Sequence, residues 1–241
     1  DKSEMTSQLL FGDHFEILEK SEKWIFIRTA YDDYEGWIDY LQYAEIDQET
    51  YVHLHDLNAI LGLSIDHPVI KMSTHEPLNL VAGSNLPFFK EGNFQINDVT
   101  YNLQEQPINP QKSNFNVEIE KASKFYLNSP YLWGGRSPFG IDCSGFTQIV
   151  FKQFGIRLKR DAYQQAEQGQ LVDFLQEAKL GDLAFFDNED GKITHVGIML
   201  NSHKIIHASG RVKINRIDDQ GIYNEELKCY THNLRIIKRF N

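Results

Sequence analysis

The sequence predicts an α+β protein in which a strand-rich front region precedes a region of helices and antiparallel strands. Two observations support this prediction. In the first 110 residues, short apolar and aromatic runs alternate with turn residues, and only 53–63 has the character of a short helical connection. Beyond residue 110, helical and strand-like patterns follow one another. A chain of 241 residues accommodates two domains, and we expect them at 1–110 and 111–241.

The front region contains closely spaced short strands, a pattern typical of a small β-barrel. Residues 24–27 and 36–38 are β-type runs that end at turns rich in Gly, Asp, Glu and Lys. Similar runs return at 68–103. The region therefore forms either one elaborated barrel or two small barrels, at about 1–50 and 66–108.

A polar stretch at 103–116 separates the two regions. It contains Pro107 and Pro110, and such a composition is typical of a linker. Residues 117–127 then have the pattern of a helix, which must stop at the Asn-Ser-Pro sequence that ends at Pro130. We place the domain boundary within this polar stretch.

The segment 131–146 is the most informative part of the chain, because it delivers a single cysteine to the predicted start of a helix. After Cys143, apolar residues recur at three- and four-residue spacing until Gly155, and Asp142 occupies the N-cap position. Unpaired backbone N–H groups and the helix dipole stabilise a thiolate at such a position. Cys143 is therefore a candidate nucleophile, and we expect its pKa to be lowered.

Two histidines supply candidate acid–base groups. Residues 194–200 alternate so that His195 lies on the face opposite the aliphatic side chains, and a second strand at 204–208 carries His207. With a three-residue turn at 201–203, antiparallel pairing places both histidines on one face, whereas a two-residue turn separates them. In the first arrangement His195 takes the thiol proton and His207 orients it.

Composition excludes several classes of partner. The net charge is −10 and no cluster of Lys and Arg stands out, which argues against nucleic acid or an anionic membrane surface. No apolar run approaches the ~20 residues of a membrane helix. Cys143 and Cys229 are too few for a disulfide framework, so we expect free thiols, with Cys229 structural. We expect no metal and no cofactor.

Four motifs in the second region resemble those of the NlpC-type cell-wall cysteine peptidases. They are the run from 130 to 146, Gly-Asp-Leu-Ala-Phe-Phe at 181–186, Thr-His-Val-Gly-Ile at 194–198 and Ile-His-Ala at 206–208. The resemblance covers 117–241 in the expected order. It implies a papain-like fold in which a cysteine at a helix N-terminus packs on an antiparallel sheet. It also implies that the nucleophile, the general base and the orienting residue are Cys143, His195 and His207.

The front region resembles the bacterial SH3-like domains that precede this catalytic domain in γ-D-glutamyl-L-diamino-acid endopeptidases. Residues 32–38 are similar to a stretch that sends a tyrosine into the cleft of those enzymes. They prefer peptides with a free N-terminal L-Ala, whose ammonium is held by acidic and hydroxyl groups. Beside Asp161 this chain has Ala162, where the group often has a serine. The matching substrate-binding candidates are Tyr34, Asp142, Ser144, Asp161 and, more weakly, Glu4.

Structural roles compete for several of these residues. Asp142 and Ser144 have the side chains of helix caps, Asp161 can cap the next helix, and Trp37 can pack the barrel core. Such roles do not require a bound peptide.

We interpret the chain as a monomeric hydrolase that cuts the bond from γ-D-Glu to the diamino acid through a thioester. It would act in the bacterial cytoplasm or, after removal of a leader, in the cell envelope. Three alternatives stay open: a papain-like thiol acyltransferase, an inactive cell-wall peptide binding module, and a zinc site formed by Cys143, His195 and His207.

Overall fold

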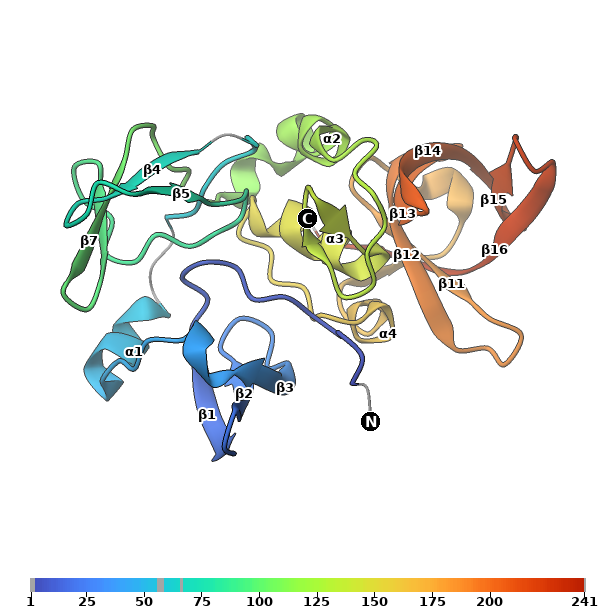
Figure 1. Cartoon of the computed structure of the whole chain (residues 1–241). Helices are drawn as coiled ribbons and strands as arrows, with labels where there is room; N and C mark the ends of the chain where they lie inside the picture. The colour runs from blue at the N-terminus through green and yellow to red at the C-terminus, as the bar shows by residue number, and fades with distance from the viewer. Residues whose placement is uncertain (1–2, 56–58, 66, 241) are drawn as a thin grey trace. The chain divides into compact units, whose positions relative to one another are not determined.

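The computed structural model describes residues 3–55, 59–65 and 67–240, and the chain forms two compact units. The front unit is Leu9–Pro110, and the C-terminal unit joins Asp1–Gln8 to Gln111–Asn241. Figure 1 labels their elements. The division at Pro110 lies within the polar stretch expected to be a linker, whereas the first eight residues group with the C-terminal unit.

The front unit contains two antiparallel sheets. The first has the order β1-β2-β3, and its strands are β1 (Phe15–Lys20), β2 (Trp24–Thr29) and β3 (Glu35–Asp39), followed by the short helix η1 (Tyr40–Gln42). The second has the order β5-β4-β7-β6, with β4 (Pro68–Lys71), β5 (Pro77–Asn79), β6 (Asn93–Ile96) and β7 (Val99–Leu103). Its core consists of Leu61, Val69, Leu80, Leu86, Phe94 and Leu103.

Two expectations for the front unit are wrong. The helix α1 (Gln48–Leu54) begins earlier than predicted, because the Asp47 side chain caps it by accepting from the Thr50 N–H at 2.7 Å. Residues 59–63 are not helical, and 56–58 lie outside the described residues. Trp37, expected in a barrel core, is 48% exposed, and its ring centroid lies 5.2 Å from that of Phe26.

The helices of the C-terminal unit follow the sequence periodicity. The predicted helices are confirmed as α2 (Phe115–Phe125) and α3 (Cys143–Lys152). All ten residues of α3 are buried, and the helix packs against strands β12 and β13 of the main sheet. The remaining short elements are η2 (Lys112–Asn114), the hairpin β8 (Arg136–Ser137) and β9 (Gly140–Ile141), α4 (Ala162–Ala166) and η3 (Leu175–Glu177).

The main sheet has seven strands in the order β10-β16-β11-β12-β13-β14-β15. Because β15 also pairs with β16, the six strands β11 to β16 close into a barrel, and β10 extends it beside β16. The strands are β10 (Gln170–Val172), β11 (Leu183–Asp187), β12 (Ile193–Asn201), β13 (Lys204–Ser209), β14 (Arg211–Asp218), β15 (Gly221–Asn224) and β16 (Cys229–Arg239).

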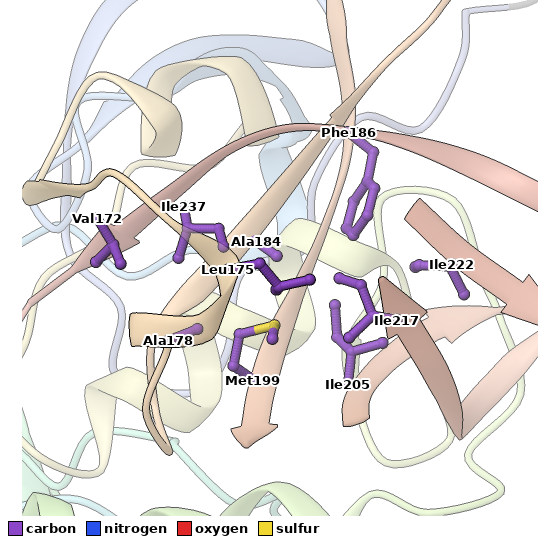
Figure 2. Close-up of a cluster of buried hydrophobic side chains, with 10 residues drawn as sticks. All are labelled: Val172, Leu175, Ala178, Ala184, Phe186, Met199, Ile205, Ile217, Ile222 and Ile237. Atoms are coloured by element: carbon purple, nitrogen blue, oxygen red, sulfur yellow. The ribbon is translucent and has the colours of Figure 1, made fainter. Parts of the chain in front are cut away.

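Apolar side chains from these strands, from η3 and from the residue that follows it form a continuous core (Figure 2). Both faces of β11, β12 and β13 are buried and apolar. Met199 and Ile205, which pair across β12 and β13, belong to this core, so strand alternation places His195 and His207 on the same face of the sheet as the core. The core consists of Val172, Leu175, Ala178, Ala184, Phe186, Met199, Ile205, Ile217, Ile222 and Ile237.

Candidate active site

Cys143 is the first residue of α3, as predicted. The helix starts there because Asp142 has extended backbone angles and its Oδ1 accepts from the Gly145 N–H at 2.6 Å. The cysteine is 5% exposed and forms no disulfide, and Cys229 is likewise a free thiol but exposed. Gly145 is required at this turn, because a Cβ there would lie 2.3 Å from the Gly135 carbonyl oxygen.

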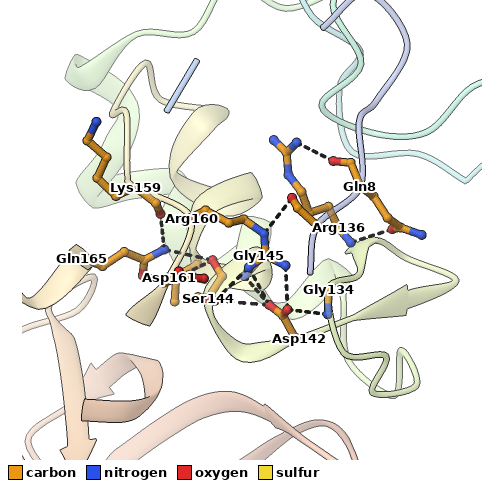
Figure 3. A network of polar contacts seen from close by, with 12 residues as sticks. Gln8, Gly134, Arg136, Asp142, Ser144, Gly145, Lys159, Arg160, Asp161 and Gln165 are labelled. Atoms are coloured by element: carbon orange, nitrogen blue, oxygen red, sulfur yellow. Dashed lines mark hydrogen bonds and ion pairs between the residues drawn. The ribbon is translucent and has the colours of Figure 1, made fainter. Parts of the chain in front are cut away.

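A buried polar network holds the start of α3 (Figure 3). Asp142 Oδ2 accepts from the Gly134 N–H at 2.8 Å and from Arg160 Nη2 at 2.6 Å, and its Oδ1 accepts from Arg160 Nη1 at 3.1 Å. Arg160 Nη1 also donates to Ser144 Oγ at 2.9 Å. Both carboxylate oxygens are therefore engaged, and the charge of Asp142 is paired with a guanidinium that is 1% exposed.

The N-terminal segment completes this network. Ser7 Oγ accepts from Arg160 Nε at 3.0 Å, Gln8 Oε1 accepts from the Arg136 N–H at 2.9 Å, and the Gln8 carbonyl accepts from Arg136 Nη1 at 2.7 Å. Figure 3 shows Gln8 alongside Arg136 in this arrangement. Ser7 and Gln8 are thus part of the support of the Cys143 turn.

The expected lowering of the Cys143 pKa is wrong. Burial raises the pKa of this thiol to about 12, and the negative charge of Asp142 acts in the same direction. The Arg160 charge and the backbone N–H groups of Val196 and Ser144 favour the thiolate, but by less. The sequence indicated the helix terminus correctly and gave no measure of how completely the sulfur is buried. The resting residue is a neutral thiol.

His195 and His207 lie on one face of the sheet, although the turn between their strands has two residues. Asn201 pairs with Lys204, so the turn consists of residues 202 and 203, which alone would place the histidines on opposite faces. A β-bulge between Met199 and Asn201 shifts the register by one residue and restores the pairing of Ile198 with Ile206. The sequence leaves both turn lengths open: the turn has two residues, and the bulge nevertheless produces the common face that was expected only with a three-residue turn.

A chain of hydrogen bonds fixes the ring orientations and the proton positions. Asn215 Nδ2 donates to the Tyr223 carbonyl at 3.3 Å, so the amide oxygen faces His207 and accepts from its Nε2–H at 3.0 Å. In a neutral ring His207 Nδ1 is then an acceptor, and the His195 Nε2–H donates to it at 2.8 Å. His195 Nδ1 is left without a proton and can accept one.

Both imidazoles are neutral in the folded protein. Burial lowers the pKa of His207 to about 3, although the hydrogen bond to Asn215 opposes this shift. Burial, and then the positive charges that His207, His232 and Lys213 can carry, hold the pKa of His195 well below its usual value. The site therefore combines a neutral thiol with two neutral imidazoles.

Three residues of this environment were not identified in the sequence. Arg160 lies 18 residues beyond Asp142, Asn215 lies on β14, and His232 lies on β16 with its ring centroid 4.1 Å from that of His195. The approach of Arg160 and His232 depends on long-range packing. Asn215 follows His207 by eight residues on the next strand, so a register prediction extended to β14 would have found it.

The other predicted residues have varied surroundings. Asp161 caps α4, as the structural alternative held, with its N–H donating to Gln164 Oε1 at 3.1 Å. Glu4 is exposed. Tyr34 lies in the turn before β3, where its N–H donates to Thr29 Oγ1 and Asp32 Oδ1 at 3.0 and 3.2 Å. The substrate-binding roles of these residues stay predictions.

A buried cysteine and a hydrogen-bonded pair of histidines are the residues of a thiol hydrolase. Comparison with known proteins agrees with this class. The model of the NlpC/P60 family matches residues 128–231, and that of the bacterial dipeptidyl-peptidase Sh3 domain matches 1–40. The gamma-D-glutamyl-L-lysine dipeptidyl-peptidase of Bacillus subtilis (strain 168) is 31% identical over 93% of this chain and 81% of its own length. The chain therefore belongs to the NlpC/P60 family of cysteine peptidases.

Other relatives agree with this assignment. A Bacillus cereus (strain ATCC 10987 / NRS 248) protein of the same name is 27% identical over 86% of this chain and 68% of its own length. The fold matches that of an NlpC/P60 family protein from Bacillus cereus ATCC 10987, with a TM-score of 0.78, 21% identity and coverage of 97% of this chain and 81% of that one. Among the described residues, no helix is both long and apolar enough to cross a membrane.

Proposed function

We propose that this protein hydrolyses the bond between γ-D-Glu and an L-diamino acid in murein-derived peptides that carry a free N-terminal L-Ala. The observation that carries the proposal is the hydrogen-bonded order His195–His207–Asn215, which leaves Nδ1 of His195 without a proton. His195 adjoins Val196, and the Val196 N–H bonds the Cys143 sulfur. The peptidase names of the relatives support the reaction class, and those of two Bacillus proteins support the γ-D-glutamyl bond.

The proposed reaction starts from the neutral pair. His195 Nδ1 takes the thiol proton as Cys143 Sγ attacks the γ-carbonyl carbon, and the developing oxyanion accepts from the backbone N–H of Cys143. Collapse of this intermediate breaks the C–N bond, the imidazolium protonates the leaving amine, and a thioester remains. His195 then removes a proton from water, which hydrolyses the thioester and regenerates the thiol.

The hydrogen-bond chain supports both protonation states of His195. When Nδ1 gains a proton, the Nε2–H continues to donate to His207 Nδ1, so no ring has to rotate. His207 is held in turn by Asn215. We therefore assign His207 and Asn215 as positioning residues that act through His195.

For the substrate ammonium we propose Ser144 and Asp161 as the principal ligands in the C-terminal unit, with a weaker contribution from Glu4. Asp142 is a predicted ligand as well, but its charge is paired with Arg160. We therefore propose that Asp142 positions Ser144 and contacts the ammonium only through Oδ1, the oxygen that accepts from the Ser144 hydroxyl. The role of Tyr34 stays a prediction, to be measured with Tyr34→Phe.

The test is a mass-spectrometric digest of L-Ala-γ-D-Glu-L-Lys and its diaminopimelate counterpart, each beside its N-acetylated form. Wild-type protein should cleave only the free-amine peptides, Cys143→Ala should cleave none, and Cys229→Ser should match wild type because its thiol is exposed and takes no part in the proposed reaction. Equal cleavage of the acetylated peptides would contradict the ammonium site. Cleavage by Cys143→Ala would contradict the thiol mechanism.

A further inference from the structure

His232 is a histidine at the site that the proposed reaction does not use. It lies on β16 with a partly exposed ring, 5.5 Å from the His207 ring between centroids. One ring nitrogen from each of His195, His207 and His232 lies within 4.8 Å of the other two. Three imidazole nitrogens therefore converge, and the ring of His232 is the partly exposed one of the three.

The donor set favours a borderline transition-metal cation. Imidazole nitrogen suits Zn²⁺, Cu²⁺ and Ni²⁺, whereas Mg²⁺ and Ca²⁺ require oxygen ligands. Around a tetrahedral Zn²⁺ with Zn–N distances of about 2.0–2.1 Å, ligand nitrogens are about 3.3 Å apart. His195 Nε2 and His207 Nδ1 are already 2.8 Å apart, so chiefly the partly exposed His232 ring has to move, by about 1.5 Å.

The outer contacts of two rings are those that metal-binding histidines have. A ligating imidazole keeps its second ring nitrogen on a hydrogen-bond partner, which fixes its orientation. His207 Nε2 donates to Asn215 Oδ1 at 3.0 Å, which leaves Nδ1 for a metal. His232 Nδ1 lies 2.8 Å from Thr231 Oγ1, which leaves Nε2. Both rings are thus orientated before any cation arrives.

We propose that His195, His207 and His232 bind a Zn²⁺-like divalent cation, and that its binding reversibly switches off hydrolysis. A cation on His195 Nε2 displaces the proton of that nitrogen to Nδ1, so the ring stays neutral but Nδ1 becomes a donor. It can then no longer accept the Cys143 proton. The cation site stands independently of the proposed function, whereas the switch rests on it.

Lys213 opposes cation binding. It pairs with His207 across β13 and β14, so both side chains are on the same face of the sheet. A positive charge at this position weakens the attraction for a second cation, and the site should consequently release its metal readily. Removing the lysine charge should strengthen binding, while removing His232 should weaken it, which gives two variants with opposite expected effects.

The affinity for Zn²⁺ is measured on the full chain by competition with a chromophoric chelator. His232→Gln should weaken binding by more than about 10-fold, since even loss of an outer-shell partner costs about 10- to 100-fold. Lys213→Gln should bind more tightly, and His203→Gln, on an exposed histidine of the β12–β13 turn, should match wild type. The site would be overturned if His232→Gln bound Zn²⁺ as tightly as wild type. It would also be overturned if His232→Gln still bound Zn²⁺ while Cys143→Ala did not.

The switch is measured separately with the free-amine peptide. Zn²⁺ should inhibit wild type at the concentrations at which it binds, a chelator should restore the rate, and Lys213→Gln should be inhibited at lower Zn²⁺. Full hydrolysis by zinc-saturated protein would overturn the switch. A protein that hydrolyses nothing without metal would instead contradict the proposed function, and the binding measurement would still decide the cation site.

Discussion

Asn215 provides the sharpest test of the hydrogen-bond chain. In Asn215→Ala, His207 Nε2–H loses its acceptor in a buried site, which costs about 1–3 kcal/mol. His207 can avoid this cost by moving its proton to Nδ1, but that nitrogen then opposes the Nε2–H of His195 at 2.8 Å. His195 must change tautomer in response and loses the acceptor that Cys143 requires. If the whole cost falls on the transition state, kcat falls by about 5- to 150-fold.

The assay measures kcat and KM separately for peptide hydrolysis. The fall should be in kcat, because Asn215 does not contact the reacting atoms in the proposed mechanism. Asn215→Asp keeps the acceptor and should retain most activity, with the pH–rate profile displaced to higher pH because a carboxylate stabilises imidazolium. Asn233→Ala removes an exposed asparagine of the same sheet and is the matched control. A kcat of Asn215→Ala equal to that of the control would refute the reasoning.

Three further predictions concern the support of the site. Gly197→Ala places a Cβ 2.8 Å from that of His207. This substitution should lower the free energy of unfolding in urea by about 1–3 kcal/mol and should also lower kcat. An unchanged unfolding midpoint would contradict this prediction. Arg160→Met leaves the buried Asp142 carboxylate unpaired and should cost about 3–5 kcal/mol, and Arg160→Lys should recover little of this because only a guanidinium makes the paired contacts. In a Cys229→Ser background, the rate of alkylation of Cys143 by iodoacetamide should be low at neutral pH and should still increase at pH 10, because the raised pKa keeps the thiol protonated. An alkylation rate that levels off near pH 5 would contradict the neutral thiol.

The sequence predicted those parts of the site that depend on local rules. The start of α3 follows from Asp142 capping and from the spacing of apolar residues, and strand alternation places His195 and Gly197 on one face of β12, whereas the common face of His195 and His207 also requires the bulge. Capping also explains the misplaced helix of the front unit, because the Asp47 side chain starts α1 at Gln48, before the 53–63 segment whose composition indicates a helix. Assignments of substrate-binding residues rest on resemblance and await measurement.

The remaining features depend on tertiary structure. The raised pKa of Cys143 reflects burial, which a helix position alone does not reveal. The bulge before Asn201 compensates for a short turn, and no residue type at that point signals it. His232 joins the site because the pairing of β15 with β16 closes the barrel. Each of these features combines segments that are separate in the sequence.

The contacts of Ser7 and Gln8 have a practical consequence for dissecting the chain. A fragment that begins at Gln111 would contain every candidate catalytic residue and yet lack the groups that satisfy Arg160 Nε and the Arg136 N–H. We expect such a fragment to lose rigidity at the Cys143 turn, even with its barrel intact. A chain in which a short linker replaces residues 9–110 and joins residues 3–8 to Gln111 would be the better minimal peptidase.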